Sequence, residues 1–223
     1  MIKALFLDFY GTVVYEDGEV IEKIVQEIIR TGNEESRSEV GGYWWHEFQT
    51  GFMKAHGENF ETQRAVEYRS LANTIEHFGS SADADALSNE MFEYWRKPPI
   101  FPESKEFFEK CPVPIYIVSN IDRADILAAI EYHGLKPAGV FTSEDARSYK
   151  PEKELFELAL DSTGLSADQV IHIGDSFSSD VKGAGAVDIK AIWVNRRGLP
   201  VPGNTMAIGN LLEIFQLEGL VCL

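Results

Sequence analysis

The chain has 223 residues, of which 44% are hydrophobic and 12% aromatic, so it can bury a sizeable core as one large domain or as one domain with an insertion. Its formal net charge of −16 argues against nucleic acid or an anionic membrane surface as the main partner. The sequence shows neither a membrane-span-length apolar run nor a signal-peptide pattern. Only two cysteines occur, Cys111 and Cys222, so we expect no disulfide framework and a cytoplasmic location.

The first predicted element is a short strand that leads into a carboxylate. Residues 4–7 are small or apolar, Asp8 follows them, and Gly11-Thr12 forms a turn. A short apolar run bounded by turn signals is typical of a strand buried on both faces of a parallel sheet. Such sheets carry their chemistry just beyond the carboxyl ends of the strands. Taken alone, Asp8 fits a turn cap as well as a catalytic group.

A long helical stretch follows this strand. Apolar residues at spacings of three and four predict helices at 19–30, 35–56, 61–78 and 83–96, with Gly41-Gly42 as a weak point in the second. The block is several times longer than an ordinary crossover connection, so we expect it to form its own bundle. This divides the chain into a core domain of residues 1–16 and 98–223 and a helical domain of residues 17–97.

Strands and helices alternate over the rest of the chain. Apolar runs predict strands at 113–118, 139–142, 169–173 and 190–194. Helices are expected at 101–110, 122–132, 152–164, 180–185 and 210–217. This alternation indicates an α/β core with a Rossmann-like parallel sheet.

Polar clusters accompany the later strands, namely Ser119-Asn120, Lys150-Pro151 and the segment from Gly174 to Asp180 that contains Asp175. Each cluster taken singly is explained as well by a turn, a helix entry or an N-cap. Together with Asp8, and in this order, they resemble the four motifs of the haloacid dehalogenase superfamily of hydrolases. The resemblance covers the sheet-forming parts of the chain. It implies that the helical insertion after the first motif is a cap that closes over the site.

The resemblance implies that Asp8 is a covalent nucleophile. The Thr12 hydroxyl can hold an anionic oxygen, and Ser119 and Asn120 can donate hydrogen bonds to the oxygens of a transferred group. Lys150 can orient Asp8 and offset charge among the clustered carboxylates.

A magnesium site is expected beside the nucleophile. Asp8, Asp175 and Asp180 converge from different strands and would repel one another without a cation. Their oxygens, with the main-chain carbonyl of Tyr10, are the ligands that Mg²⁺ prefers. The strongly acidic chain also needs a local positive charge if the substrate is an anion.

The cap of such a protein selects the substrate. Trp44, Trp45 and Phe48 form an aromatic cluster that we expect to pack mostly between cap helices. His46 and Lys54 are the two cap residues that we nominate as substrate contacts.

Tyr10 departs from the phosphatases that the chain resembles, which carry a general-acid Asp at this position. A phenol with a pKa near 10 is poorly matched to proton transfer at neutral pH. The form Asp-x-Tyr-Gly-Thr looks like the 2-haloacid dehalogenase branch, where a halide leaves without a proton and no metal is used.

Against that branch, Asp175 stands in a motif that carries Ser and Asn there. Dehalogenases of that branch hold their substrate with an Arg in the early cap, and the matching segment here, 43–48, has none. Arg37 is a poor candidate for that role. Phe156 stands where those dehalogenases carry a Tyr.

We therefore expect a Mg²⁺-dependent phosphatase that acts on a small phosphorylated metabolite with a good leaving group, without nucleic acid or membrane as a partner. One alternative is a metal-independent 2-haloacid dehalogenase. The other is a non-catalytic binding protein that retains the fold.

Overall fold

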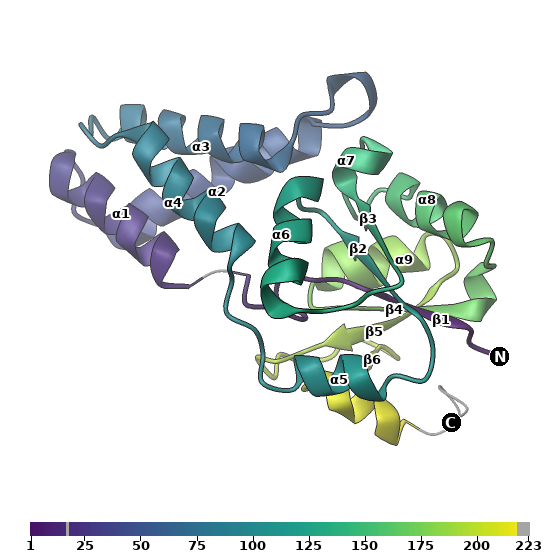
Figure 1. Ribbon diagram of the computed structural model, residues 1–223. Coiled ribbons are helices and arrows are strands. Elements are labelled where there is room, and N and C mark those ends of the chain that lie inside the picture. The colour runs from purple at the N-terminus through teal and green to yellow at the C-terminus, as the bar shows by residue number, and fades with distance from the viewer. Residues whose placement is uncertain (17, 218–223) are drawn as a thin grey trace.

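The computed structural model describes residues 1–16 and 18–217 and contains a parallel β-sheet (Figure 1). Its strands are Ala4–Leu7 (β1), Ile115–Ser119 (β2), Gly139–Thr142 (β3), Val170–Gly174 (β4), Lys190–Val194 (β5) and Met206–Ile208 (β6). They lie in the order β3-β2-β1-β4-β5-β6, and each neighbouring pair is parallel. The predicted α/β class with a Rossmann-like sheet is confirmed.

Helices fall into two groups along the chain. The first group comprises Glu19–Thr31 (α1), Arg37–Lys54 (α2), Gln63–His77 (α3) and Ala84–Arg96 (α4). The second comprises Ser104–Lys110 (α5), Arg123–His133 (α6), Ser143–Ala146 (α7), Glu154–Thr163 (α8) and Gly183–Gly185 (α9).

The strands send alternate side chains into two separate cores. Leu5 and Leu7 of β1 enter the core that α5, α6 and residues 211–216 cover. Ala4 and Phe6 enter the core that α8 and α9 cover. The sheet is therefore the middle of three layers. All of β1 is buried, as predicted for a strand covered on both faces.

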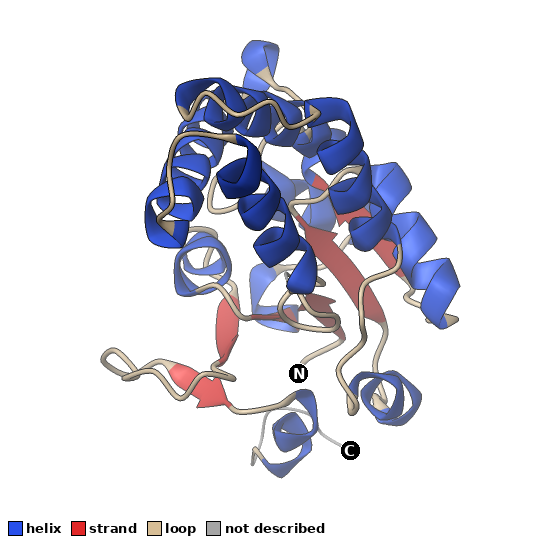
Figure 2. Ribbon diagram, turned by 90° about the vertical axis from the view of Figure 1, so that its left-hand side faces the viewer, coloured by secondary structure: helices blue, strands red, loops and turns tan. Residues whose placement is uncertain are grey.

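Helices α1–α4, called here the cap, gather at one end of the sheet at the upper left of Figure 1, and Figure 2 shows them above the strands. The two segments that connect the cap to the core run side by side. Tyr15 N–H donates to the Pro99 carbonyl at 2.9 Å, and Phe101 N–H donates to the Val13 carbonyl at 3.2 Å. Helix α4 also packs on α6 of the core.

Several predicted helices begin or continue differently in the structure. Gly41-Gly42 does not interrupt α2, because Val40 and Trp44 on either side are buried and hold this turn in place. The helix expected at 180–185 begins earlier, as a π-helical turn over Phe177–Lys182 that precedes α9. The Ser176 hydroxyl accepts from Ser179 N–H and starts that turn, so Asp180 lies inside it rather than at its N-cap.

The remaining differences concern short elements near strand ends. Strand β6 is an edge strand of three residues and was not expected, since so short a run carries no periodicity. Helix α7 is a single turn closed by a capping box at Thr142, and the last helix is a 3₁₀ helix, Leu211–Gln216.

None of the helices among the described residues is long and apolar enough to cross a membrane. Cys111 is a free thiol, and Cys222, to which the expectation of unpaired cysteines also applied, lies outside the described residues.

Candidate active site

Three carboxylates meet at the carboxyl ends of β1 and β4. Asp8 directly follows β1, and Asp175 and Asp180 lie in the segment that follows β4. One oxygen from each lies within 4.8 Å of the other two. Because β1 and β4 are neighbours in the sheet, their ends necessarily place these side chains together.

Lys150 joins two of the carboxylates. Its ammonium donates to Asp8 Oδ1 at 2.8 Å, to Asp180 Oδ1 at 2.6 Å and to the Val118 carbonyl at 2.9 Å. The side chain is 2% exposed. Although burial disfavours the charged amine, Asp180 and Asp8 raise the pKa of Lys150 above its usual range, so it stays a cation.

A buried histidine lies behind Asp180, and sequence reasoning missed it. His172 of β4 is fully buried, and its Nε2 lies 2.8 Å from Asp180 Oδ1. Burial lowers the pKa of His172, so the ring is neutral and Nε2 carries the proton that it donates. Asp180 Oδ2 accepts from Ser176 N–H at 2.9 Å. Against the cost of burial, Lys150 and His172 hold the pKa of Asp180 below its usual range.

The other two carboxylates are electrostatically strained. Burial raises the pKa of Asp8 to about 6, although Lys150 opposes the shift. Burial, with repulsion from Asp8, Glu16 and Asp180, raises the pKa of Asp175 to about 9. Asp175 therefore retains its proton at neutral pH unless a positive charge comes close.

The turn after Asp8 packs directly on Asp175. Gly11 has φ +84°, a conformation that glycine adopts without strain, and a Cβ added there would lie 2.4 Å from an Asp175 carboxylate oxygen. The Thr12 hydroxyl donates to Asp175 Oδ1 at 3.2 Å. Only glycine allows this approach.

The donor set fits a hard divalent cation. Mg²⁺ binds oxygen at about 2.1 Å, so ligands on opposite sides lie about 4 Å apart. One oxygen from each carboxylate lies within 4.8 Å of the other two, close enough for all three to reach one ion after small movements, and the carboxylates carry more negative charge than Lys150 neutralises. Asp180 already accepts three hydrogen bonds of the roughly four that a carboxylate can accept, which leaves it less free to coordinate than Asp8 and Asp175.

The end of β2 supplies Ser119 and Asn120. Ser119 is 2% exposed, and its strand pairs with β1, which leads into Asp8. The Asn120 amide bonds the main chain of Lys150 in both directions, donating to its carbonyl at 3.0 Å and accepting from its N–H at 2.7 Å. Asn120 thus holds the lysine-bearing segment, and its contact with a substrate oxygen stays a prediction.

Tyr10 is directed to the base of the cap. Its hydroxyl donates to the carbonyl of Trp95 in α4. Burial, reinforced by Asp125 and Asp8, raises the pKa of Tyr10 well above its ordinary value. A phenol in this position keeps its proton, and that proton is used in the hydrogen bond to the carbonyl of Trp95.

The cap residues nominated from the sequence lie exposed on α2, and the contact of His46 and Lys54 with a substrate stays a prediction. Aromatic residues of the cap instead meet the core. Phe52 and Phe60 lie 3.9 and 5.3 Å, between ring centroids, from Tyr149, the residue before Lys150. Of the expected aromatic cluster, Trp44 is buried, whereas Trp45 is 57% exposed.

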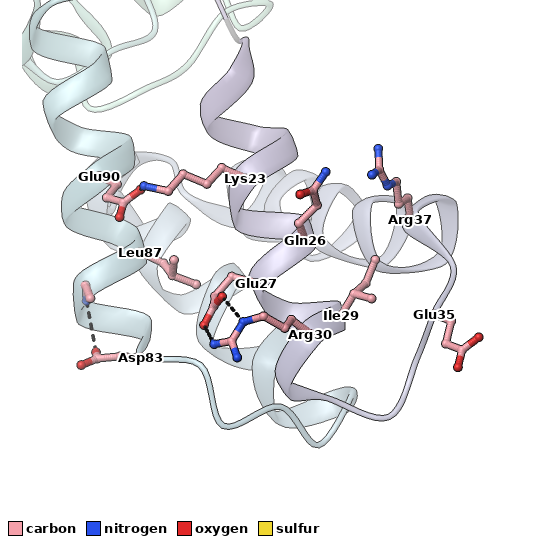
Figure 3. Close-up of a pocket in the computed structure, with 11 residues that line it drawn as sticks. Lys23, Gln26, Glu27, Ile29, Arg30, Glu35, Arg37, Asp83, Leu87 and Glu90 are labelled. Carbon is pink, nitrogen blue, oxygen red and sulfur yellow. Dashed lines mark hydrogen bonds and ion pairs between the residues drawn. The ribbon is translucent and has the colours of Figure 1, made fainter.

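A surface pocket of the cap lies apart from these carboxylates, between α1 and α4 (Figure 3). Two ion pairs lie within its lining, between Lys23 and Glu90 at 2.6 Å and between Arg30 and Glu27 at 2.6 Å. None of the carboxylates at the strand ends lines it. The reactive groups gather at the strand ends, so we take the carboxylate cluster as the candidate site.

Curated relatives include a phosphatase. A phosphoserine phosphatase from Thermus thermophilus is 26% identical over 164 residues, which are 68% of this chain and 65% of that protein. The chain spans between 45% and 65% of the length of the curated relatives it matches.

Solved structures share the fold. The L-2-haloacid dehalogenase from Xanthobacter autotrophicus superposes with a TM-score of 0.77 at 18% identity, covering 99% of this chain and 100% of that one. The HAD-hydrolase YfnB from Bacillus subtilis, bound to magnesium, gives a TM-score of 0.78 at 19% identity and covers 96% of this chain and 97% of that one. The model of the family described as haloacid dehalogenase-like hydrolase matches residues 2–188. The chain belongs to the haloacid dehalogenase-like hydrolases.

Proposed function

We propose that this protein is a Mg²⁺-dependent phosphatase that acts on a small phosphorylated metabolite, with residues 17–97 as its cap domain and residues 1–16 and 98–223 as its core. The observation that carries the proposal is Asp175. It lies against the nucleophile turn, bonded by Thr12, and burial among carboxylates raises its pKa to about 9. A reaction that expels a halide from an uncharged carbon gains nothing from this added carboxylate, whereas a metal-assisted reaction does.

In the proposed reaction Asp8 attacks phosphorus, the bond from phosphorus to the leaving oxygen breaks, and the leaving group departs as an oxyanion. Water then hydrolyses the aspartyl phosphate, releasing inorganic phosphate and restoring Asp8. Lys150 orients the Asp8 carboxylate, and Thr12, Ser119 and Asn120 are the proposed partners of the phosphoryl oxygens.

A bound Mg²⁺ would supply the positive charge that offsets the phosphoryl group and the carboxylates. We propose Asp8, Asp175 and the Tyr10 carbonyl as its main ligands, with Asp180 as a weaker one because Lys150 and His172 already bond its oxygen.

Tyr10 does not protonate the leaving group in this proposal, because its hydroxyl is bonded to Trp95 and its pKa is raised. We therefore expect faster turnover of substrates whose leaving group is already stable as an anion.

The test is hydrolysis of p-nitrophenyl phosphate with and without Mg²⁺, comparing the wild-type protein with Asp8→Asn and with Asp161→Asn, which changes an exposed aspartate of α8. Turnover that needs Mg²⁺, is abolished in Asp8→Asn and persists in Asp161→Asn supports the proposal. Turnover unchanged by chelation of the metal would contradict it.

Tyr10 favours a second candidate, a metal-independent 2-haloacid dehalogenase, because a halide leaves without a proton. Its test is release of chloride from 2-chloropropionate in the presence of a chelator. Chloride release without phosphatase activity would support the dehalogenase, which Tyr10 favours, over the phosphatase, which Asp175 favours. A protein inactive in both assays that still binds vanadate would fit the non-catalytic alternative.

A further inference from the structure

Arg196 follows β5 and reaches the turn that carries the nucleophile. Its Nη2 donates to the Thr12 carbonyl at 2.7 Å, and its Nε donates to the Gly11 carbonyl at 3.3 Å. Both acceptors belong to the turn that packs on Asp175. A planar guanidinium presents donors in a fixed geometry, so it can hold two adjacent carbonyls at once, which a lysine ammonium does less well.

The same guanidinium also engages the segment by which the chain returns from the cap. Its Nη1 donates to Glu103 Oε1 at 2.7 Å, and its central carbon lies 3.5 Å from the centroid of the Phe101 ring. The Arg196 side chain is 19% exposed and that of Glu103 is 14% exposed. Arg196 therefore joins the loop after β5, the nucleophile turn and the start of α5.

The end of β5 holds the other side of the carboxylate cluster as well. Trp193 Nε1 donates to the main-chain carbonyl of Asp175 at 2.8 Å. Neighbouring residues of one strand end thus fix the main chain on both sides of the Thr12–Asp175 hydrogen bond.

We propose that Arg196 is a positioning residue that fixes the Gly11–Thr12 turn against Asp175 and so sets the placement of the nucleophile. The inference rests on the proposed function for its effect on turnover, and the rigidity of the turn is measurable independently of any reaction. Misplacement of a reacting group by about 1 Å can lower a rate roughly 100-fold.

The experiment compares Arg196→Ala with Arg197→Ala, which removes the same charge from an exposed neighbour. We expect Arg196→Ala to lower kcat on p-nitrophenyl phosphate by roughly 10- to 100-fold with KM changed less than about threefold, because the turn and not the binding surface is disturbed. Millimolar guanidinium should restore part of kcat in Arg196→Ala, and ammonium at equal ionic strength should not. Arg197→Ala should retain wild-type kcat.

Hydrogen exchange of residues 9–14 supplies the readout that does not depend on the reaction. We expect faster exchange of Gly11 and Val13 N–H in Arg196→Ala, with guanidinium slowing it again. If the wild-type protein turns over no phosphate ester, the proposed function fails while the exchange result still decides this inference. Arg196→Lys, which keeps the charge and loses the paired donors, serves if Arg196→Ala does not fold and should show the same faster exchange. Unchanged exchange, or a loss of kcat that guanidinium does not restore, would overturn the proposal.

Discussion

Arg64 of the cap donates two parallel hydrogen bonds to Asp125 of the core, from Nε at 2.6 Å and from Nη2 at 2.5 Å. The Asp125 side chain is 1% exposed, so bulk solvent has little access to this carboxylate. Next to it, Asp122 accepts from the N–H groups of Gln63 and Arg64 and thereby caps the start of α3 from the core side.

Breaking this ion pair should loosen the cap. In Arg64→Met the buried Asp125 loses its ion-pair partner, and loss of one member of a buried pair costs about 3–5 kcal/mol, less here because the Arg64 side chain is 39% exposed. We expect hydrogen exchange of residues 57–64 to accelerate at the interface with the core. Arg30→Met, which breaks an exposed pair with Glu27 within α1, is the control and should leave that exchange unchanged. If residues 57–64 exchange at the same rate in the variant and in its control, contacts other than the ion pair hold the cap on the core.

Tyr10→Phe should leave the hydrolysis of p-nitrophenyl phosphate nearly intact. The variant removes only the hydrogen bond to Trp95, and the leaving group needs no proton. We expect kcat within about threefold of the wild-type value and an unchanged pH profile. A fall of 100-fold or more, confined to substrates with poor leaving groups, would instead identify Tyr10 as an acid.

Mg²⁺ binding should release protons. The pKa of Asp175 is raised to about 9, so at pH 7 its carboxyl is protonated in the metal-free protein and must lose that proton to coordinate. Affinity for Mg²⁺ should therefore rise with pH between pH 6 and pH 9, and calorimetry in two buffers of different ionisation enthalpy should detect the released proton. Asp175→Asn should lose Mg²⁺ binding, whereas Asp161→Asn should keep it. Binding without proton release would contradict the assignment.

Glu67 should make the cap less stable at high pH. It is 5% exposed between α2 and α3, and burial raises its pKa to about 8. The folded state therefore binds a proton between pH 4.5 and pH 8 that the unfolded state does not, so stability is highest below this window and falls as pH rises through it.

Glu67→Gln removes this titration. We expect its free energy of unfolding, relative to wild type, to grow by roughly 2–4 kcal/mol between pH 5 and pH 8. Urea unfolding at several pH values measures the free energy of unfolding of both proteins. The carboxylates at the strand ends are the same in both, so their contribution cancels in the difference. Glu76→Gln, on the exposed side of α3, should parallel the wild-type curve. Parallel curves for Glu67→Gln as well would show that the Glu67 carboxyl is solvated.

The parts of the fold that were predicted from sequence are those whose signal is local. The apolar runs before Asp8 and before Gly174 predict buried strands. Neighbouring parallel strands bring their carboxyl ends together however long the chain between them is. The same rule, applied to the strand that ends at Val194, would have drawn attention to Arg196.

Contacts between segments that are far apart in the chain have no local pattern in the sequence that predicts them. Arg64 looks like any cationic residue of a helix until α3 is placed against Asp125. His172 alternates with apolar neighbours in a strand and is indistinguishable from a core residue until Asp180 turns back on it. Their roles depend on tertiary approach and not on spacing along the chain.

Strand β1, which leads into Asp8, lies in the middle of the sheet although it is the first strand in the chain. Leu5 pairs with Ile115 on one side and with Ile171 on the other. During synthesis on the ribosome, β1 therefore emerges long before either neighbour exists, while the cap helices can fold from local contacts. Every residue of the cap is synthesised before the strands that pair with β1, and the candidate site cannot assemble until β4 and Asp180 have emerged.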